Sequence, residues 1–155
     1  RLFSVLDQLG ENVLYFDTDS VIFKTHKSDN LHYLPIGNFL GELTNEITPE
    51  DGHIVEFVSG GPKNYAYRTL SGREDCKVRG FTLNWVNSKM INFEAIKSLI
   101  CTAQDKQIEI INPCKISRDS RKRKLLNRVE TKRYQMVYTK RRILPSFDTL
   151  PFGFC

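Results

Sequence analysis

Two short apolar runs enclose four polar residues near the start of the chain, and this arrangement restricts the local fold more than any other feature. The apolar runs are residues 13–16 and 21–23, and the polar residues between them are Asp17, Thr18, Asp19 and Ser20. Such a pattern is typical of two antiparallel strands joined by a tight turn. The sequence therefore predicts a β-hairpin with these four residues at its tip.

Asp17 and Asp19 are the candidate metal ligands of this hairpin. Residues two apart on an extended backbone point to the same side, so the two carboxylates are expected to face a shared cation. Carboxylates held this close repel each other unless a divalent metal or a basic group lies between them. A solvated surface turn is the alternative. An EF-hand calcium loop is excluded, because Val21 and Ile22 occupy the positions where it needs an oxygen ligand and a glycine.

The composition favours a folded domain. The chain has 155 residues, of which 40% are hydrophobic, enough for one domain or parts of two. No apolar run approaches the roughly 20 residues of a membrane span, and the start of the chain lacks the layout of a signal peptide. The four cysteines have neither zinc-site spacing nor a disulfide framework, so buried, reduced thiols are expected at Cys76, Cys101, Cys114 and Cys155.

Positive charge is concentrated in one segment. Residues 115–142 contain twelve lysines or arginines and two acidic residues, a local balance of +10 in a chain of net charge +5. This segment is therefore expected to face a polyanion. A solvated face and a nuclear-import signal are the alternatives. The densest cluster is Arg121, Lys122, Arg123 and Lys124.

Helical periodicity appears in three places. The first predicted helix ends at Gly10, the second begins at Pro35, and the third is capped by Asn92. Their apolar positions are Leu2, Val5, Leu6 and Leu9; then Ile36, Phe39, Leu40, Leu43 and Ile47; then Phe93, Ile96, Leu99 and Ile100.

Further strand-like runs follow the hairpin. Residues 54–58, 63–69 and 76–81 are separated by turn-forming residues and predict a three-stranded antiparallel meander. Residues 107–111 and 114–118 predict two short strands, and the alternation around Tyr134, Met136 and Tyr138 predicts one more. The expected fold class is α+β.

Three motifs resemble those of one polymerase family. Residues 15–20, Y-F-D-T-D-S, resemble the Y-x-D-T-D-S signature of family B DNA polymerases, which forms a hairpin tip in the palm. Lys63 and Tyr65, expected on one face of a strand, resemble the K-x-Y element found near the primer terminus. Lys77 and Arg79 in K-V-R-G-F resemble the basic K-x-[KR]-G-F strand that follows. Without this context, the element with Lys63 and Tyr65 would be a turn followed by a strand. The element with Lys77 and Arg79 would be an exposed strand edge.

The order of the motifs resembles the protein-primed members of the family. The tail T-L-P-F-G-F at residues 149–154 is also similar to the ending of polymerases from Maverick-Polinton transposons and related viruses. The resemblance implies residues 1–82 as the C-terminal part of a palm, with an antiparallel hairpin and sheet packed by helices, and residues 83–155 as a small mixed α/β thumb. The sequence does not fix the location; the resemblance is compatible with a nuclear or viral-replication site inside the cell, and it implies no membrane partner.

The resemblance also implies roles for individual residues. Asp17 and Asp19 would be catalytic and would bind two Mg²⁺ ions together with upstream residues absent from this chain, as in two-metal nucleotidyl transfer. Tyr15 and Thr18 would lie at the incoming dNTP, with Tyr15 packed beneath the site and Thr18 shaping the turn. The implied DNA-binding residues for the primer-template are Lys63, Tyr65, Lys77, Arg79, Arg121, Lys122, Arg123 and Lys124.

Other family motifs do not occur in these 155 residues. The D-x-x-S-L-Y-P-S strand, the K-x-x-x-N-S-x-Y-G helix and an exonuclease D-x-E motif are not found, and the first two are expected upstream. The chain is therefore predicted to be the C-terminal part of a DNA-directed DNA polymerase, inactive alone, with a terminal priming protein as a possible further partner. A transposon- or virus-derived remnant that only binds nucleic acid is the alternative. A sugar transferase with a D-x-D metal site gives no role to Lys63, Tyr65 or the basic segment.

Overall fold

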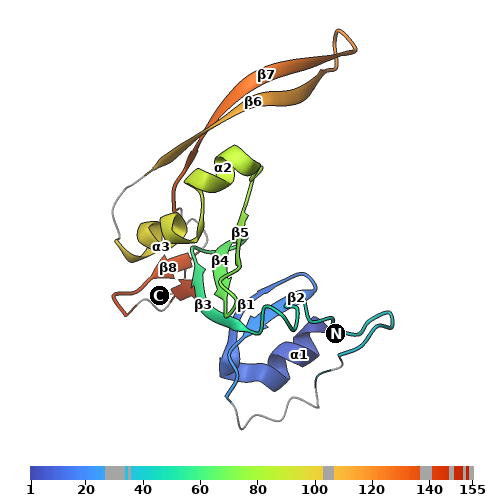
Figure 1. Cartoon of the computed structure of the whole chain (residues 1–155), viewed down its shortest axis with the longest axis vertical. Helices are drawn as coiled ribbons and strands as arrows, with labels where there is room; N and C mark the ends of the chain where they lie inside the picture. The colour runs from blue at the N-terminus through green and yellow to red at the C-terminus, as the bar shows by residue number, and fades with distance from the viewer. Residues whose placement is uncertain are drawn as a thin grey trace. The chain divides into compact units, whose positions relative to one another are not determined.

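Figure 1 shows the computed structural model of the chain. The structure describes residues 1–26, 34, 36–102, 107–136, 141–146, 149–151 and 153. The chain forms two compact units, the first made of Arg1–Val55 and Thr69–Arg73 and the second of Glu56–Arg68 and Glu74–Cys155. The fold is mixed α+β, as the sequence predicted, with more residues in strands than in helices. The functional division into residues 1–82 and 83–155 stays a prediction.

The first unit contains the predicted N-terminal helix and hairpin. Helix α1 (Leu2–Leu9) ends at Gly10, which has a positive φ of 52°, and a short 3₁₀ turn, η1 (Gly10–Asn12), leads into the hairpin. Strand β1 (Val13–Asp17) pairs antiparallel with β2 (Ser20–Phe23). The buried side of α1 packs on the hairpin through a small core. Its residues are Val5, Leu9 and Leu34, with Val13, Val21, Phe23 and Leu43 packed against them.

The predicted second helix is wrong over its described residues. Residues 36–47 form bends and turns, with a single parallel bridge between Ile36 and Leu43. Gly41 has a φ of 90°, outside the helical region, so it interrupts the helical path. Phe39 and Leu40, which were expected to form the apolar face, are 81% and 106% exposed. Because that face is not buried, packing does not offset the low helix propensity of Gly37 and Gly41. Pro35 lies outside the described residues.

The predicted meander is present, with shifted ends. The strands β3 (Ile54–Ser59), β4 (Asn64–Thr69) and β5 (Glu74–Val78) form a three-stranded sheet in that order. Strand β4 is antiparallel to β5. One face of this sheet packs on helix α3 (Phe93–Cys101), whose predicted cap, Asn92, accepts a hydrogen bond from the Ala95 backbone N–H at 2.9 Å. The sequence missed helix α2 (Trp85–Met90), which is capped in the same way by Asn84.

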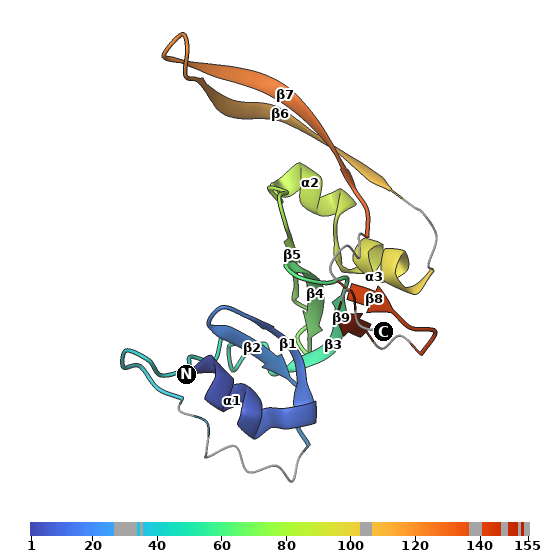
Figure 2. The ribbon, with the colours of Figure 1, turned by 180° about the vertical axis from the view of Figure 1, so that it is seen from behind.

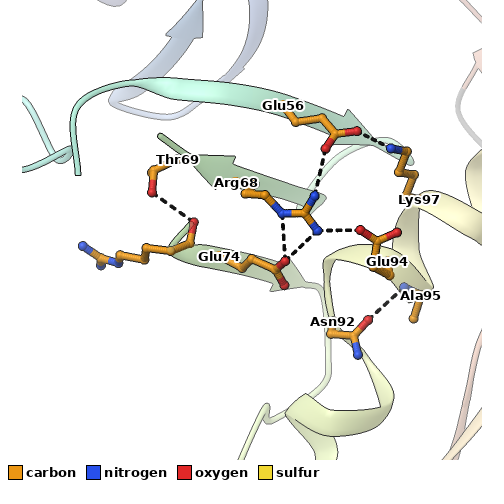
Figure 3. A network of polar contacts seen from close by, with 9 residues as sticks. Glu56, Arg68, Thr69, Glu74, Asn92, Glu94, Ala95 and Lys97 are labelled. Carbon is orange, nitrogen blue, oxygen red and sulfur yellow. Dashed lines mark hydrogen bonds and ion pairs between the residues drawn. The ribbon is translucent and has the colours of Figure 1, made fainter. Parts of the chain in front are cut away.

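The main core lies where these elements meet the base of the last long strands. Its buried residues come from β4, the α2–α3 connection, α3, β6 and β7, and they are Ala66, Ile91, Phe93, Ile96, Leu99, Ile110 and Tyr134. Arg68 of β4 ties the sheet to α3 (Figure 3). Its guanidinium forms ion pairs with Glu56, Glu74 and Glu94. It also lies 4.4 Å from the centre of the Phe93 ring.

Two predicted short strands are one long strand. Strand β6 (Ile108–Asp119) pairs antiparallel with β7 (Lys124–Tyr134), and we call this pair the ribbon. The register shifts between Asn112 and Lys115, so Pro113 lies in a bulge, where a residue without an N–H is tolerated. The strand predicted around residues 134–138 is wrong in position, because β7 ends at Tyr134 and Met136 follows it. Tyr138 lies outside the described residues.

The end of the described chain forms a small antiparallel pair, β8 (Arg141–Ile143) and β9 (Thr149–Pro151). The thiols differ from the expectation of burial, since Cys101 and Cys114 are exposed and Cys76 is half-buried. Burial raises the pKa of the Cys76 thiol to about 11. Cys155 lies outside the described residues. None of the described helices is long and apolar enough to cross a membrane.

Candidate functional site

Asp17 and Asp19 lie at the tip of the β1–β2 hairpin. Asp17 is the last residue of β1 and pairs with Ser20, so Thr18 and Asp19 alone form the turn. The Asp19 backbone N–H donates to the Asp17 carbonyl at 2.6 Å, the hydrogen bond of a very tight three-residue turn. The predicted position of the pair at a hairpin tip is therefore confirmed.

The expected extended backbone between the two aspartates is wrong. Thr18 has a φ of 52°, in the left-handed region that a β-branched residue rarely adopts. Strain of this kind persists only where the surrounding structure imposes it, and it is concentrated at functional sites. The turn thus separates the two aspartates by a backbone reversal and not by strand alternation.

The two carboxylates have different surroundings. Asp17 is half-buried, and its Oδ1 accepts a hydrogen bond from the Thr18 hydroxyl at 3.1 Å. The Ser20 hydroxyl donates to the Asp17 carbonyl at 3.1 Å and closes the turn. Asp19 is exposed, and among the described residues its carboxylate has no hydrogen bond or ion pair. Asp17 is therefore fixed by the turn, whereas Asp19 faces solvent.

This donor set fits Mg²⁺ in part. Magnesium is commonly held by one or two carboxylates that leave room for water and substrate phosphates, and the tip offers two carboxylates. Within the described part of the chain, no three His, Cys, Asp or Glu side chains are grouped to hold a metal. A complete site at this tip would need ligands from another strand.

The K-x-Y element is arranged differently from the prediction. Lys63 lies in the turn before β4 and has a φ of 58°, so it does not share a strand face with Tyr65. The expected shared face is wrong because the residues before Asn64 form a tight turn, in which the Gly60 N–H donates to the Asn64 carbonyl at 2.9 Å. Lys63 remains exposed beside the start of the strand.

Tyr65 has a different basic neighbour. It is the register partner of Lys77 on β5, and directly opposed residues of an antiparallel pair project to the same face. The Tyr65 ring also lies 6.0 Å from that of Phe57 on β3. The Lys77 ammonium lies 3.2 Å from Asp75 Oδ2, so part of its charge is neutralised locally. Arg79 is exposed in the turn after β5, and its N–H donates to Asn64 Oδ1 at 3.3 Å.

The basic cluster lies at the far end of the ribbon. Asp119 pairs with Lys124, so residues 120–123 form the loop between the strands. The Asp119 carboxylate accepts hydrogen bonds from the backbone N–H groups of Arg121 and Lys122, both at 3.0 Å, which is the signature of an aspartate-initiated turn. Residues 120–129 are all exposed. We call Arg121, Lys122, Arg123 and Lys124 the basic tip.

The ribbon becomes less basic toward its base. Glu130 pairs with Lys115 and with Lys132, and the hydrogen bond from Lys115 holds the pKa of Glu130 below its ordinary value. Arg133 lies 3.6 Å from Glu109. Three basic residues near the base are thus paired with carboxylates, whereas the basic tip forms no ion pair with any other described residue.

One exposed aromatic residue was missed by the sequence interpretation. Trp85 of α2 is 75% exposed, and the Lys89 ammonium lies 3.4 Å from the centre of its ring. The spacing of an aromatic residue and a lysine four positions apart on a helix was the available signal.

The candidate residues are divided between the two units. Asp17, Thr18 and Asp19 belong to the first, and Lys63, Tyr65, Lys77, Arg79 and the basic tip belong to the second. Each group is therefore a separate feature of its own unit. Comparison of the chain with models of protein families, with curated proteins and with solved structures finds no match.

Proposed function

We propose that this chain is the C-terminal part of a family B DNA polymerase of the protein-primed type. The observation that carries the proposal is the tight β1–β2 hairpin with Asp17 and Asp19 at its tip, formed by the residues Y-F-D-T-D-S. The proposal is supported by two further motifs in the expected order, around Lys63 and Lys77. A long ribbon with a basic tip adds a surface suited to polyanions.

In this proposal the hairpin contributes one part of a metal site. Asp19 is solvent-facing and would bind Mg²⁺ directly, and Asp17 would bind beside it or set the local field, together with carboxylates from outside this chain. The ions would activate the primer hydroxyl and stabilise the triphosphate. Tyr15, half-buried on β1 two residues before Asp17, would support the tip from below.

The second unit would hold the primer-template. Tyr65 and Lys77 would contact the primer strand from one face of the sheet, since an aromatic ring and an ammonium suit a sugar or base and its phosphate. The ribbon would bind duplex phosphates without reading the sequence. Its exposed arginines and lysines match the sequence-independent electrostatic mode of DNA binding.

A second candidate function is a nucleic-acid-binding module without catalysis. The exposed basic tip favours it, because the tip would bind DNA whether or not the hairpin holds a metal. The two functions differ in primer extension, which requires Asp19 in the polymerase and does not occur in a module. DNA binding would not need this carboxylate in either case.

The decisive experiment uses Asp19→Asn, which keeps the size of the side chain and removes its charge. In the chain itself, Mn²⁺ should broaden the NMR amide signals of residues 17–20, and Asp19→Asn should abolish this effect while the hairpin shifts persist. In the longer protein that the proposal requires, the same change should lower primer extension by several orders of magnitude. DNA affinity should barely change. Near-normal extension would refute the polymerase proposal, and unaltered Mn²⁺ broadening would refute the metal site.

A further inference from the structure

Trp85 is an exposed aromatic residue on helix α2 of the second unit. It is the single tryptophan of the chain and is 75% exposed. Val86 and Met90 of the same helix are also exposed, at 59% and 46%. Grouped apolar side chains in water usually mark a binding surface. The outward side of α2 is therefore a candidate contact surface.

Lys89 shapes this surface. Its ammonium lies 3.4 Å from the centre of the Trp85 ring, a cation–π contact that favours one orientation of the indole. The lysine also places a positive charge directly at the aromatic surface. An aromatic ring with an adjacent cation is suited to a ligand that has both a flat π-system and a negative charge.

The inward side of α2 faces the basic ribbon. Asn87 is buried there and lines a cavity of about 130 Å³ together with Lys115 of β6 and Lys132 of β7. Figures 1 and 2 both show α2 beside the ribbon. The Trp85 surface thus belongs to the same unit as the described ribbon, whose strands and connecting loop contain more basic than acidic residues. Charge complementarity selects a polyanion as its ligand.

We propose that Trp85 is a stacking platform for an unpaired nucleobase of single-stranded nucleic acid. Lys89, which lies at the ring, would attract the nearest phosphate, and the indole would stack on one base, an interaction that tolerates any sequence. The ligand is single-stranded because bases within a duplex are already stacked on their neighbours and offer no free face. This inference rests on the proposed nucleic-acid-binding function and adds a site for a second form of the ligand, distinct from the duplex phosphates held by the basic tip.

The fluorescence of the chain tests this directly, because Trp85 is the only tryptophan. Titration with an oligothymidylate of about 12 nucleotides, a length within the range of single-strand sites, should quench the indole emission. A duplex of the same length should not. In anisotropy measurements with a labelled oligothymidylate, Trp85→Ala should lower affinity roughly tenfold, as expected for the loss of one stacked base. Trp85→Phe, which keeps a ring, should lower it less.

Phe3→Ala is the matched control, since Phe3 is a similarly exposed aromatic residue, at 79%, in the other unit. It should leave the affinities for the oligothymidylate and for the duplex unchanged. Circular dichroism should show that every variant folds. Binding of the labelled oligonucleotide without quenching would overturn the stacking site. Unchanged oligothymidylate affinity in Trp85→Ala would overturn it as well. Failure of the proposed duplex binding by the ribbon would appear in a separate result. In that case, alanine substitution of the basic tip would leave duplex affinity unchanged.

Discussion

Arg68 and Glu94 join the central strand of the β3-β4-β5 sheet to helix α3 through an ion pair, and the same guanidinium nitrogen also contacts Glu74 at 2.8 Å (Figure 3). Glu56 completes the set, at 3.2 Å from the other terminal nitrogen. One arginine thus bridges three carboxylates from β3, β5 and α3. Without it, these carboxylates would face one another, and among the described residues Lys97 alone would remain to pair with Glu56.

Arg68→Met should therefore destabilise the second unit. The substitution keeps much of the apolar stem but leaves three like charges close together, and it removes the cation–π contact with Phe93. Arg68→Lys should be intermediate, because an ammonium cannot form the same forked set of contacts. Urea denaturation followed by circular dichroism would measure the destabilisation. The control is Arg73→Met, whose more exposed guanidinium pairs with Asp51 and should matter less.

The contribution of Glu94 should depend on pH. The hydrogen bond from Arg68 holds the pKa of Glu94 below its ordinary value, so the unfolded chain binds the proton more readily than the folded one. The stabilisation is fully present above about pH 5 and is lost as the pH falls through the lowered pKa of the folded state. The difference in unfolding free energy between wild type and Glu94→Gln should therefore shrink in acid. Because Glu94 is largely exposed, added salt should also reduce it. A difference that is constant with pH would contradict the ion pair.

The strained turn gives a prediction about the hairpin. Thr18→Gly removes the penalty of a positive φ and should stabilise the first unit by about 1 kcal/mol, less whatever its hydroxyl contributes through the hydrogen bond to Asp17. Because glycine also frees the backbone, the two carboxylates should be held less firmly, and Mn²⁺ affinity should fall. Thermal unfolding and NMR line broadening would measure the two effects in the same samples. Thr18→Asn is the comparison variant, since asparagine tolerates this conformation and keeps a polar group.

The basic tip gives a prediction about salt. Replacing Arg121, Lys122, Arg123 and Lys124 with Ala should lower duplex affinity and flatten the plot of log affinity against log salt concentration. The slope should change by about 0.9 units for each duplex phosphate that the variant no longer neutralises. As a charge-matched control, Lys24→Ala in the first unit should change the slope less than Arg121→Ala does. An unchanged slope in the fourfold variant would assign the tip to solvent or to a protein partner.

The sequence predicted elements well where local pattern and packing agree. The hairpin at residues 13–23, helix α1 and the Asn92-capped helix α3 were all visible as apolar patterns with matching turn or cap residues. The pattern failed at residues 36–47, because periodicity alone does not say whether a face will be buried. It also failed between the strands predicted at 107–111 and 114–118, which are one strand, because Pro113 lies in a bulge that β7 pairs across.

The candidate site was predictable in position but not in geometry. Alternation along a strand placed Asp17 with Asp19 and Lys63 with Tyr65. A positive φ at Thr18 instead reverses the backbone between the two aspartates, and a positive φ at Lys63 leaves that residue in the turn before the strand of Tyr65. The pairing of Tyr65 with Lys77 depends on strand register, which a loop of uncertain length leaves open. The turn at the basic tip could have been found from Asp119, whose side chain binds the backbone two and three residues ahead.

Each strand of the ribbon is hydrogen-bonded on one side only among the described residues, so both of its outer edges display backbone groups that a second ribbon could pair with. The exposed side chains of Ile116, Leu125 and Val129 would stabilise such pairing through apolar contacts. The arginines and lysines oppose it, because two like-charged ribbons repel as they approach. This repulsion acts over a Debye length of about 10 Å at 0.1 M salt and is weaker at higher ionic strength. The positive charge should therefore oppose edge-to-edge association of two ribbons. Its neutralisation by a bound polyanion would permit neighbouring copies to associate side by side.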